Sequence, residues 1–372
     1  MSVSTAPDDV KKVLVAMSGG VDSSVAALLL KEQGWDCVGC TMRLFSEEPA
    51  TTAEKTCCSL DAVEDARSVA FRLGMPYHVF NFSDAFETDV ITPFVYSYTE
   101  GKTPNPCIAC NRCLKFDRLY ERAKILGCSA VATGHYARIC REGDRFSLKK
   151  ARDRSKDQSY VLYTLTQEQL AHTLFPLGEL EKQQTRALAE KHGFLNANRP
   201  DSQDICFVPD GDYAAFIERR LGRRFPPGDF VSPDGRVLGR HQGIIHYTVG
   251  QRRGLGVPAE TKLYVSAIDP VNNTVTLCRE EELLIDTVVA DHVNVLSGDP
   301  ESVPVRGQVR LRYRQPERPA EIRLDGDRMI IRFDEPQRAP APGQAAVVYD
   351  EDGETVLAGG TILSSGKERT TG

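Results

Sequence analysis

With 372 residues, 41% of them hydrophobic and 26% charged, the chain has the composition of an ordinary globular protein and is long enough for two or three domains. A net charge of −6 excludes a protein coated in basic surface but leaves room for a local basic face. The N-terminus fits neither a signal nor a transit peptide, and the apolar runs fall short of the roughly 18 residues that a membrane helix needs, so we expect a cytoplasmic protein without membrane contact.

The first part of the chain alternates between apolar strands and helices that end near glycine. Strands are predicted at residues 13–17, 37–42, 77–82 and 130–133, and helices at 25–33, 61–73 and 114–126. Such alternation predicts an α/β fold with a doubly wound parallel sheet, whose ligands bind at the carboxyl ends of the strands.

After about residue 210 the pattern changes to short segments with period-two alternation, broken by turn sequences such as Pro-Pro-Gly and Pro-Asp-Gly. This pattern is typical of small β domains. We therefore expect an α/β catalytic domain at 1–208, a small central domain at 209–286 and a C-terminal β-barrel at 287–368.

The segment SGGVDSS, residues 18–24, stands where the first strand meets the first helix. Two glycines allow a tight turn, and the hydroxyls and free N–H groups at a helix start can hold an anion, so the segment predicts a phosphate site. It lacks the Gly-Lys-Ser/Thr of a Walker loop. It resembles instead the PP-loop of ATP pyrophosphatases, which hold the pyrophosphate of ATP while AMP is transferred to a substrate oxygen. A plain turn with Asp22 or Ser23 capping the helix is the structural alternative.

Three cysteines, Cys107, Cys110 and Cys113, stand at successive C-x-x-C spacings in TPNPCIACNRC. In a cytoplasmic chain with 11 cysteines, such spacing favours thiol chemistry, metal ligation or burial over a disulfide framework. On an α-helix the three thiols would lie within roughly a 120° arc. Four further cysteines occupy apolar segments and are expected in the core: Cys37, Cys40, Cys128 and Cys278.

A basic segment, Arg306–Arg323, carries six arginines against two glutamates and includes Tyr313. Arg252 and Arg253 add charge on a glycine-flanked loop. Such segments can hold RNA phosphates and stack on bases, although a solvated strand face gives a similar pattern.

Seven motifs together resemble one family in their order along the chain. They are SGGVDSS, TPNPCIACN, ATGHYAR, KDQSYVLY, DSQDICF, HYTVGQRRGLG and VRLRYRQ. From about residue 10 to 365 the chain is similar to bacterial tRNA-uridine 2-sulfurtransferases. The resemblance implies an enzyme that uses ATP and Mg²⁺ to adenylate O2 of the wobble uridine in the tRNAs for lysine, glutamate and glutamine. Sulfur then replaces that oxygen, so the implied partners are tRNA and a sulfur-donor protein, not DNA.

The resemblance also assigns binding residues. It places the following at the ATP site: Ala16, Met17, Ser18, Gly19, Gly20, Val21, Asp22, Ser23, Met42 and Gly134. It places the following at tRNA-contacting positions: Asn105, Pro106, Cys107, His135, Lys156, Asp157, Gln158, Arg312, Tyr313 and Gln344.

Sulfur transfer is implied for Cys110 and Cys206, which match the two family positions for that work. In most members the residue at Cys206 would bear a persulfide, and the residue at Cys110 would attack it. Cys107 stands where the family normally has aspartate. With three thiols, Cys107, Cys110 and Cys206 resemble the thiolases that hold a 4Fe-4S cluster with one open iron. A two-cysteine persulfide relay and a structural zinc site that includes Cys113 remain alternatives.

Two other functions compete with tRNA thiolation. A PP-loop ligase that amidates a small metabolite would explain residues 18–24 but not the cysteines or the basic segment. A non-catalytic RNA-binding module with a metal would leave the phosphate loop unexplained.

Overall fold

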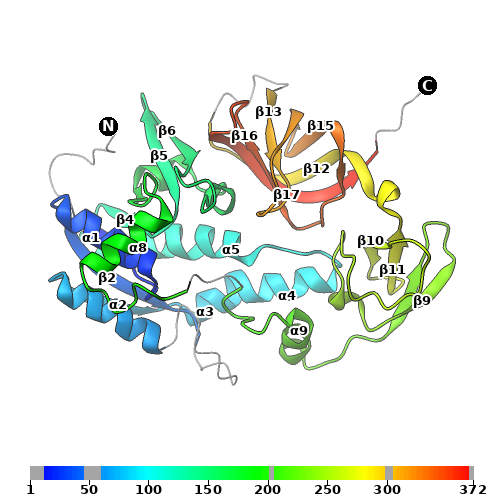
Figure 1. Ribbon diagram of the computed structural model, residues 1–372, viewed down its shortest axis with the longest axis horizontal. Coiled ribbons are helices and arrows are strands. Elements are labelled where there is room, and N and C mark those ends of the chain that lie inside the picture. Colours follow the sequence, from blue (N-terminus) through cyan, green and yellow to red (C-terminus); the bar gives the residue numbers. More distant parts are fainter. Residues whose placement is uncertain (1–11, 46–59, 201–204, 298–304, 368–372) are drawn as a thin grey trace. The chain divides into compact units, whose positions relative to one another are not determined.

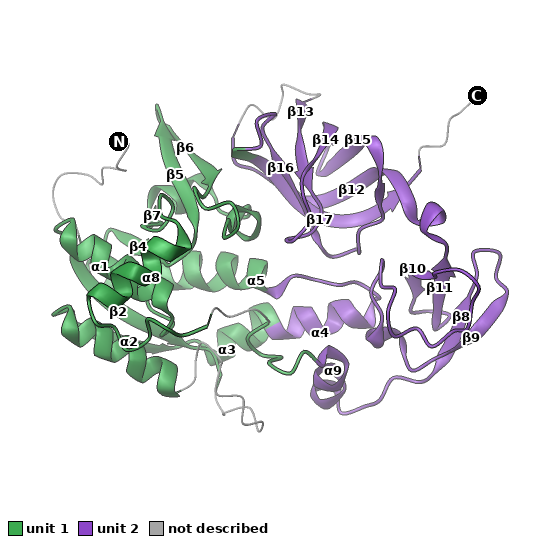
Figure 2. Cartoon of the chain, in the orientation of Figure 1, with its two compact units in different colours: residues 1–90, 107–211, 354–356 green, residues 91–106, 212–353, 357–372 purple. Residues whose placement is uncertain are grey.

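The structure is a computed structural model that describes residues 12–45, 60–200, 205–297 and 305–367. Its elements form two compact units, which Figure 2 colours separately. Unit 1 comprises residues 1–90, 107–211 and 354–356. Unit 2 comprises residues 91–106, 212–353 and 357–372.

Unit 1 is built on a parallel five-stranded sheet in the order β3-β2-β1-β4-β7. Strands β2 and β4 of this sheet are labelled in Figure 1. Its strands are β1 (Lys12–Ala16), β2 (Asp36–Arg43), β3 (Tyr77–Asn81), β4 (Ala130–Ala132) and β7 (Thr173–Leu174). The central strand is apolar because both faces of such a sheet are covered, and Val13, Leu14 and Val15 are fully buried. The predicted doubly wound parallel sheet is confirmed.

Helices α1 (Val21–Glu32), α2 (Leu60–Arg72) and α8 (Lys182–Lys191) share one buried cluster with β1. Helix α1 begins at Val21, earlier than the predicted start at Val25, because Gly20 takes the extended N-cap conformation directly before it. Strands β2 and β4 flank β1 on opposite sides. The loops that follow β1 and β4 therefore meet at a topological switch point, where open α/β sheets bind ligands.

A long helical segment connects β3 to β4. It contains α3 (Ser83–Phe86), η1 (Glu87–Ile91), α4 (Thr92–Thr99), α5 (Pro106–Ala109), η2 (Cys110–Arg118) and α6 (Leu119–Ile125). The helix predicted at residues 114–126 is present, but it begins earlier, at Pro106, and η2 is a π-helix. Proline suits a first helical position because its missing N–H would have no intrahelical partner there.

Unit 1 also contains an antiparallel hairpin that the sequence did not predict. Strands β5 (Ala137–Glu142) and β6 (Arg145–Lys150) turn at Gly143, where φ is 63°. Strand β6 pairs with Thr355 and Val356, so this short piece of the C-terminal region belongs to unit 1. The short helices η3 (Ser159–Leu162) and α7 (Gln167–Ala171) follow.

Unit 2 contains helix α9 (Tyr213–Leu221) and two β structures. A four-stranded sheet has the order β10-β11-β8-β9, with β8 (Gly228–Val231), β9 (Val237–His241), β10 (Tyr264–Asp269) and β11 (Thr274–Cys278). The short helices η4 (Ile244–His246) and η5 (Glu280–Leu283) accompany it.

The second β structure of unit 2 is a closed barrel. Its strands are β12 (Leu284–Val295), β13 (Val305–Arg310), β14 (Arg318–Asp325), β15 (Arg328–Arg338), β16 (Ala345–Tyr349) and β17 (Thr355–Gly366). They follow the order β12-β15-β14-β13-β16-β17, and β12 pairs with β17 to close the ring. The predicted small central domain and C-terminal β-barrel are confirmed as a fold class. Across the described ranges, the helices are all too short or too polar to span a membrane.

Candidate active site

The glycine-rich loop lies between β1 and α1, and the first turn of α1 holds it. The Ser18 N–H donates to Ser23 Oγ at 3.2 Å. The hydroxyls of Ser23 and Ser24 donate to the Gly20 carbonyl at 3.0 and 3.1 Å. These hydroxyls therefore help to shape the loop. Backbone N–H groups at the start of α1 remain the feature suited to phosphate.

The glycines around this loop differ in what a side chain would meet. A Cβ on Gly19 would lie 2.3 Å from the Ala62 carbonyl oxygen, and φ at Gly19 is +74°. A Cβ on Gly134 would lie 2.7 Å from the Ser23 nitrogen. A Cβ on Gly20 would meet, among the described atoms, only Ser18 Oγ at 3.5 Å. Close packing within the protein thus explains why positions 19 and 134 need glycine, which has no Cβ. Gly20, in contrast, has space beside it that a ligand could occupy.

Gly134→Ala is expected to destabilise unit 1 by about 1–3 kcal/mol, because its Cβ would press on backbone atoms of α1 that cannot rotate away. Thermal unfolding measures this. Gly366→Ala is the control, since Gly366 has no described atom within 4 Å of the added Cβ. Equal unfolding temperatures for the two variants would contradict this packing.

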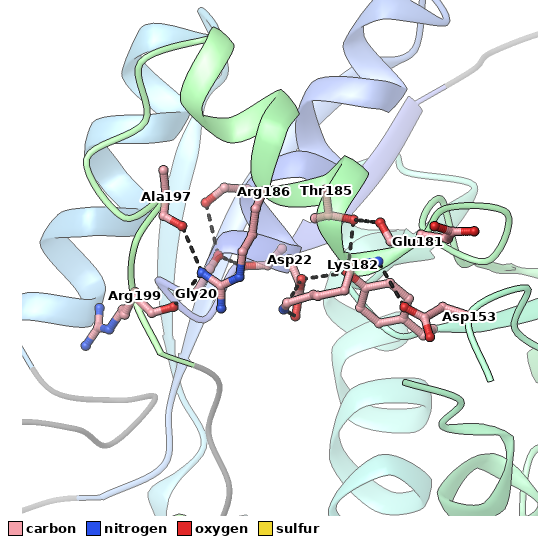
Figure 3. A network of polar contacts seen from close by, with 12 residues as sticks. Gly20, Asp22, Asp153, Glu181, Lys182, Thr185, Arg186, Ala197 and Arg199 are labelled. Atoms are coloured by element: carbon pink, nitrogen blue, oxygen red, sulfur yellow. Dashed lines mark hydrogen bonds and ion pairs between the residues drawn. The ribbon is translucent and has the colours of Figure 1, made fainter. Parts of the chain in front are cut away.

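The carboxylate of Asp22 is the centre of a polar network (Figure 3). Lys182 Nζ donates to both of its oxygens, at 2.7 and 2.8 Å, and Tyr136 donates its hydroxyl at 2.9 Å. The Tyr136 hydroxyl also lies 2.9 Å from Thr185 Oγ1. Sequence analysis identified Asp22 but missed Lys182 and Tyr136. Tyr136 stands inside the ATGHYAR motif, whereas no local pattern marks Lys182.

Residues that follow α8 reach back to the loop. Asn196 Nδ2 donates to the Gly19 carbonyl at 2.8 Å and to Ser24 Oγ at 2.9 Å. Arg199 forms an ion pair with Asp65 at 2.6 Å. The segment just before the DSQDICF motif is therefore anchored on the glycine loop. Residues 201–204 of that motif lie outside the described residues.

Expected ATP-site residues come together at one edge of the sheet. Ala16 ends β1, Met42 lies near the end of β2, and Gly134 follows β4. The Thr41 hydroxyl donates to the Met17 carbonyl at 2.5 Å, and Met17 N–H donates to the Cys40 carbonyl at 2.7 Å. With the loop and Asp22, these residues form one region at the switch point of unit 1.

Contrary to the sequence prediction, the three cysteines at C-x-x-C spacing do not all lie on one α-helix. Cys107 belongs to α5 and is exposed, while Cys110 and Cys113 belong to η2 and are half-buried. A π-helix closes hydrogen bonds from i to i+5, so each residue turns through less than the 100° of an α-helix. Residues three apart then point in more divergent directions. The predicted 120° arc of thiols therefore does not hold.

Cys206 lies in a turn of unit 1, next to Phe207, whose ring packs edge-on against Phe86 at 5.7 Å. The described residues include Cys107, Cys110 and Cys206, yet among them no group of three His, Cys, Asp or Glu side chains is placed to hold a metal ion. The three thiols therefore do not fit a preformed cluster site in this conformation.

The cysteines expected in the core are buried, as predicted: Cys37, Cys40, Cys128 and Cys278. Burial raises the pKa of the Cys37 thiol to about 12 and raises the pKa of Cys40 further. Because the thiolate is the reactive form, these cysteines are unreactive near neutral pH.

Three expected tRNA contacts in unit 1 have structural partners. His135 is 7% exposed and packs against the rings of Phe116 and Phe175, and this burial lowers its pKa well below the usual value. The Asp157 carboxylate accepts the N–H groups of Ala151 and Ser159 at 3.1 and 3.2 Å.

Gln158 Oε1 accepts the Tyr136 N–H at 2.9 Å. Lys156, next to them, is half-buried. Gln158, whose N–H also donates to the Tyr136 carbonyl at 2.8 Å, thus holds the turn that precedes η3 against the segment that carries Tyr136.

Two expected tRNA contacts in unit 2 also anchor loops. Gln344 Nε2 donates to the Thr103 carbonyl at 2.6 Å, and Arg312 Nη2 donates to the Val249 carbonyl at 2.7 Å. Tyr313, beside Arg312, is 38% exposed. Thr103 leads directly into Asn105 and Pro106, so the barrel residue Gln344 holds the base of the loop that precedes Cys107.

Three family models match the chain. Residues 11–210 match "tRNA methyl transferase HUP domain", residues 214–279 match "tRNA methyl transferase PRC-barrel domain", and residues 285–362 match "Aminomethyltransferase beta-barrel domain". A solved structure, "U34-tRNA thiolase NcsA from Methanococcus maripaludis with its [4Fe-4S] cluster", aligns at 19% identity and a TM-score of 0.34, over 57% of this chain and 67% of that one.

Curated relatives are far more similar. "tRNA-specific 2-thiouridylase MnmA" of Clostridioides difficile strain 630 is 48% identical over 358 residues, which cover 95% of this chain and 99% of that protein. "tRNA-specific 2-thiouridylase MnmA 1" of Thermoanaerobacter sp. strain X514 is 49% identical over 356 residues, which cover 94% and 97%. Likeness of this degree over almost the whole of both chains shows that the protein belongs to the tRNA-specific 2-thiouridylase MnmA family.

Proposed function

We propose that this chain is a tRNA-uridine 2-sulfurtransferase that converts the wobble uridine of the tRNAs for lysine, glutamate and glutamine to 2-thiouridine in the cytoplasm. The observation that carries the proposal is the glycine loop at the switch point, with space beside Gly20 for a phosphate. The matching family model is named for methyl transfer. Methyl transfer does not require a loop that binds phosphate, whereas adenylation does.

ATP has a specific task in this reaction. The O2 atom of uridine is a poor leaving group, and bonding it to AMP makes a phosphate ester that sulfur can displace. The loop, with the first turn of α1, would hold the phosphates of ATP. Mg²⁺ would be held mainly by the phosphates and water, with one or two carboxylates at most, as is usual for this ion.

We assign sulfur transfer to Cys110 and Cys206. Cys206 would receive sulfur from a donor protein as a persulfide, and Cys110 would attack the inner sulfur of that persulfide. A disulfide between Cys110 and Cys206 would form, and the outer sulfur would leave as hydrosulfide, attack C2 of the adenylated uridine and displace AMP together with the former O2. A dithiol reductant would then reopen the disulfide. Asn105, Pro106 and Cys107 precede Cys110 directly and would meet the base. A 4Fe-4S cluster on Cys107, Cys110 and Cys206 stays a hypothesis, because the described residues do not assemble that ligand set in this conformation.

A direct assay tests the proposal. Protein purified without oxygen is incubated with ATP, a sulfide or persulfide source and bulk tRNA, and the digested tRNA is analysed for 2-thiouridine. Formation of 2-thiouridine that depends on ATP supports the proposal. ATP turnover on a small amide substrate without thiolated tRNA would favour the ligase, and tRNA binding without either activity would favour a binding module.

Arg312→Ala is expected to weaken tRNA binding and to reduce the slope of log affinity against log salt by about one, because one phosphate contact is lost. Binding across a salt series measures this. Since Arg312 also holds the Val249 carbonyl, thermal unfolding of the variant must be compared. Arg328→Ala, an exposed arginine of β15 outside the basic segment, is the control. An unchanged salt slope in Arg312→Ala would place the RNA contact elsewhere.

A further inference from the structure

Lys182 is a buried lysine that faces the glycine loop from another helix. It is the first residue of α8, and only 10% of its side chain is exposed. Lysine is rarely buried unless it is paired, and here its ammonium donates to both oxygens of Asp22, at 2.7 and 2.8 Å. The ammonium also lies 5.7 Å from the centre of the Tyr136 ring. A cation is thus held next to the loop in a water-poor setting.

The position of Lys182 is determined at its backbone as well. Its N–H donates to Asp153 Oδ2 at 3.0 Å, and Asp153 Oδ1 accepts both the N–H and the hydroxyl of Ser155, at 3.0 and 2.6 Å. Glu181 and Gln184 form a capping box at the start of α8. Figure 3 shows the side chain of Lys182 reaching toward Asp22 from this anchored helix start. Lys182 therefore needs no large rearrangement to keep its ammonium on Asp22.

The negative charge of Asp22 would repel phosphates at the glycine loop if Lys182 did not neutralise it. Asp22 is the acidic residue in the first turn of α1, where the helix dipole favours a negative charge. The phosphates of ATP would use the same helix end, so an unpaired carboxylate there would repel them. The Asp22 side chain is 31% exposed, whereas only 10% of the side chain of Lys182, whose ammonium neutralises it, is exposed.

We infer that Lys182 is a positioning residue of the nucleotide site, which acts through Asp22 by neutralising and orienting the carboxylate beside the glycine loop. The inference rests on the proposed function only in naming ATP as the ligand. In adenylation, uridine O2 bonds to the α-phosphorus, the bond from that phosphorus to the bridging oxygen of the β-phosphate breaks, and its electron pair leaves with pyrophosphate. The N3 proton of uridine passes to solvent. By neutralising Asp22, Lys182 removes the repulsion between that carboxylate and the phosphates of ATP.

The test is equilibrium binding of ATP with Mg²⁺ in the absence of tRNA, measured by calorimetry on the full chain. Lys182→Met keeps the length of the side chain but leaves Asp22 unpaired, and we expect its Kd for ATP to rise about tenfold or more. The double variant Asp22→Asn, Lys182→Met has no net charge at this pair, and we expect its Kd to return to within about threefold of wild type. Lys191→Met, at the exposed end of α8, is the matched control and should bind ATP as wild type does.

Two results would overturn the inference. One is an unchanged Kd in Lys182→Met, and the other is a double variant that binds ATP as weakly as Lys182→Met, which would mean that Lys182 contacts ATP itself. The double variant keeps the test valid if Lys182→Met folds poorly, because removing both charges avoids an unpaired buried one. Affinity for tRNA should be the same in all variants. Since ATP binding is measured without thiolation, a wild type that forms no 2-thiouridine would count against the proposed function and leave this test intact.

Discussion

Gly20→Val is expected to lower tRNA-stimulated pyrophosphate release at least a hundredfold or so while leaving the fold intact. The reason is the environment of Gly20. Its φ is −83° and ψ is 157°, an extended conformation that valine adopts readily, and among the described atoms only Ser18 Oγ would lie near an added Cβ. The branched side chain would therefore occupy the space where the backbone must approach phosphate, and its Cβ would make no close contact with the described protein atoms.

Pyrophosphate release in the presence of tRNA, thermal unfolding and tRNA affinity check this prediction together. Gly20→Ala should fall between wild type and Gly20→Val in activity, since it adds one carbon instead of three. Gly366→Val, a glycine in β17 with no described neighbour within 4 Å of a Cβ, controls for the general effect of the substitution. Full pyrophosphate release by a well-folded Gly20→Val protein would remove this loop from the ATP site.

Cys110→Ser and Cys206→Ser are each expected to abolish 2-thiouridine formation while adenylation of tRNA continues. Both thiols are assigned to sulfur delivery, and a serine hydroxyl can carry neither a persulfide nor an iron. Thiolated nucleoside in the digest and AMP incorporation into tRNA are measured in parallel. Cys113→Ser, one C-x-x-C step further along η2, should retain both activities and is the control.

Cys107 decides between the two modes of sulfur delivery. If Cys107, Cys110 and Cys206 bind a cluster, protein reconstituted without oxygen should contain about four irons and four sulfides per chain, and Cys107→Ser should lose them together with thiolation. In a persulfide relay, iron is unnecessary, and Cys107→Asp should preserve activity in air because aspartate is the residue that the family resemblance implies. A zinc site would retain its metal in air and loosen on chelation.

An active, iron-free wild type supplied with a persulfide donor would exclude the cluster. Loss of thiolation in Cys107→Asp together with loss of iron would exclude the relay. The structure bears on this choice through η2, because its π geometry separates thiols that an α-helix would bring closer to one face. Binding of a cluster to all three cysteines would therefore require this segment, or the region of Cys206, to change conformation.

Most of the first sheet could be predicted from the sequence because its strands are short apolar runs and its helices end at glycine. β1 to β4 were all found within a residue or so, and the glycine loop was correctly placed between β1 and α1. The hairpin of β5 and β6 and the helices at 83–99 were missed. Phe86 and Phe94 in those helices are 1% exposed, so tertiary burial rather than a clear 3.6-residue pattern stabilises them.

At the site, local sequence determined the features that depend on neighbouring residues: the strand, the glycine turn, the acidic first turn of α1 and the spacing of the cysteines. Only the tertiary structure decided which groups reach them from afar. Lys182 meets Asp22 across 160 positions of sequence and Asn196 meets Gly19 across 177, and no local pattern encodes such contacts. The same holds for burial of His135 and for the inward hydroxyls of Ser23 and Ser24, because a side chain's partners are set by the packing of the completed fold and not by the residues beside it in the chain.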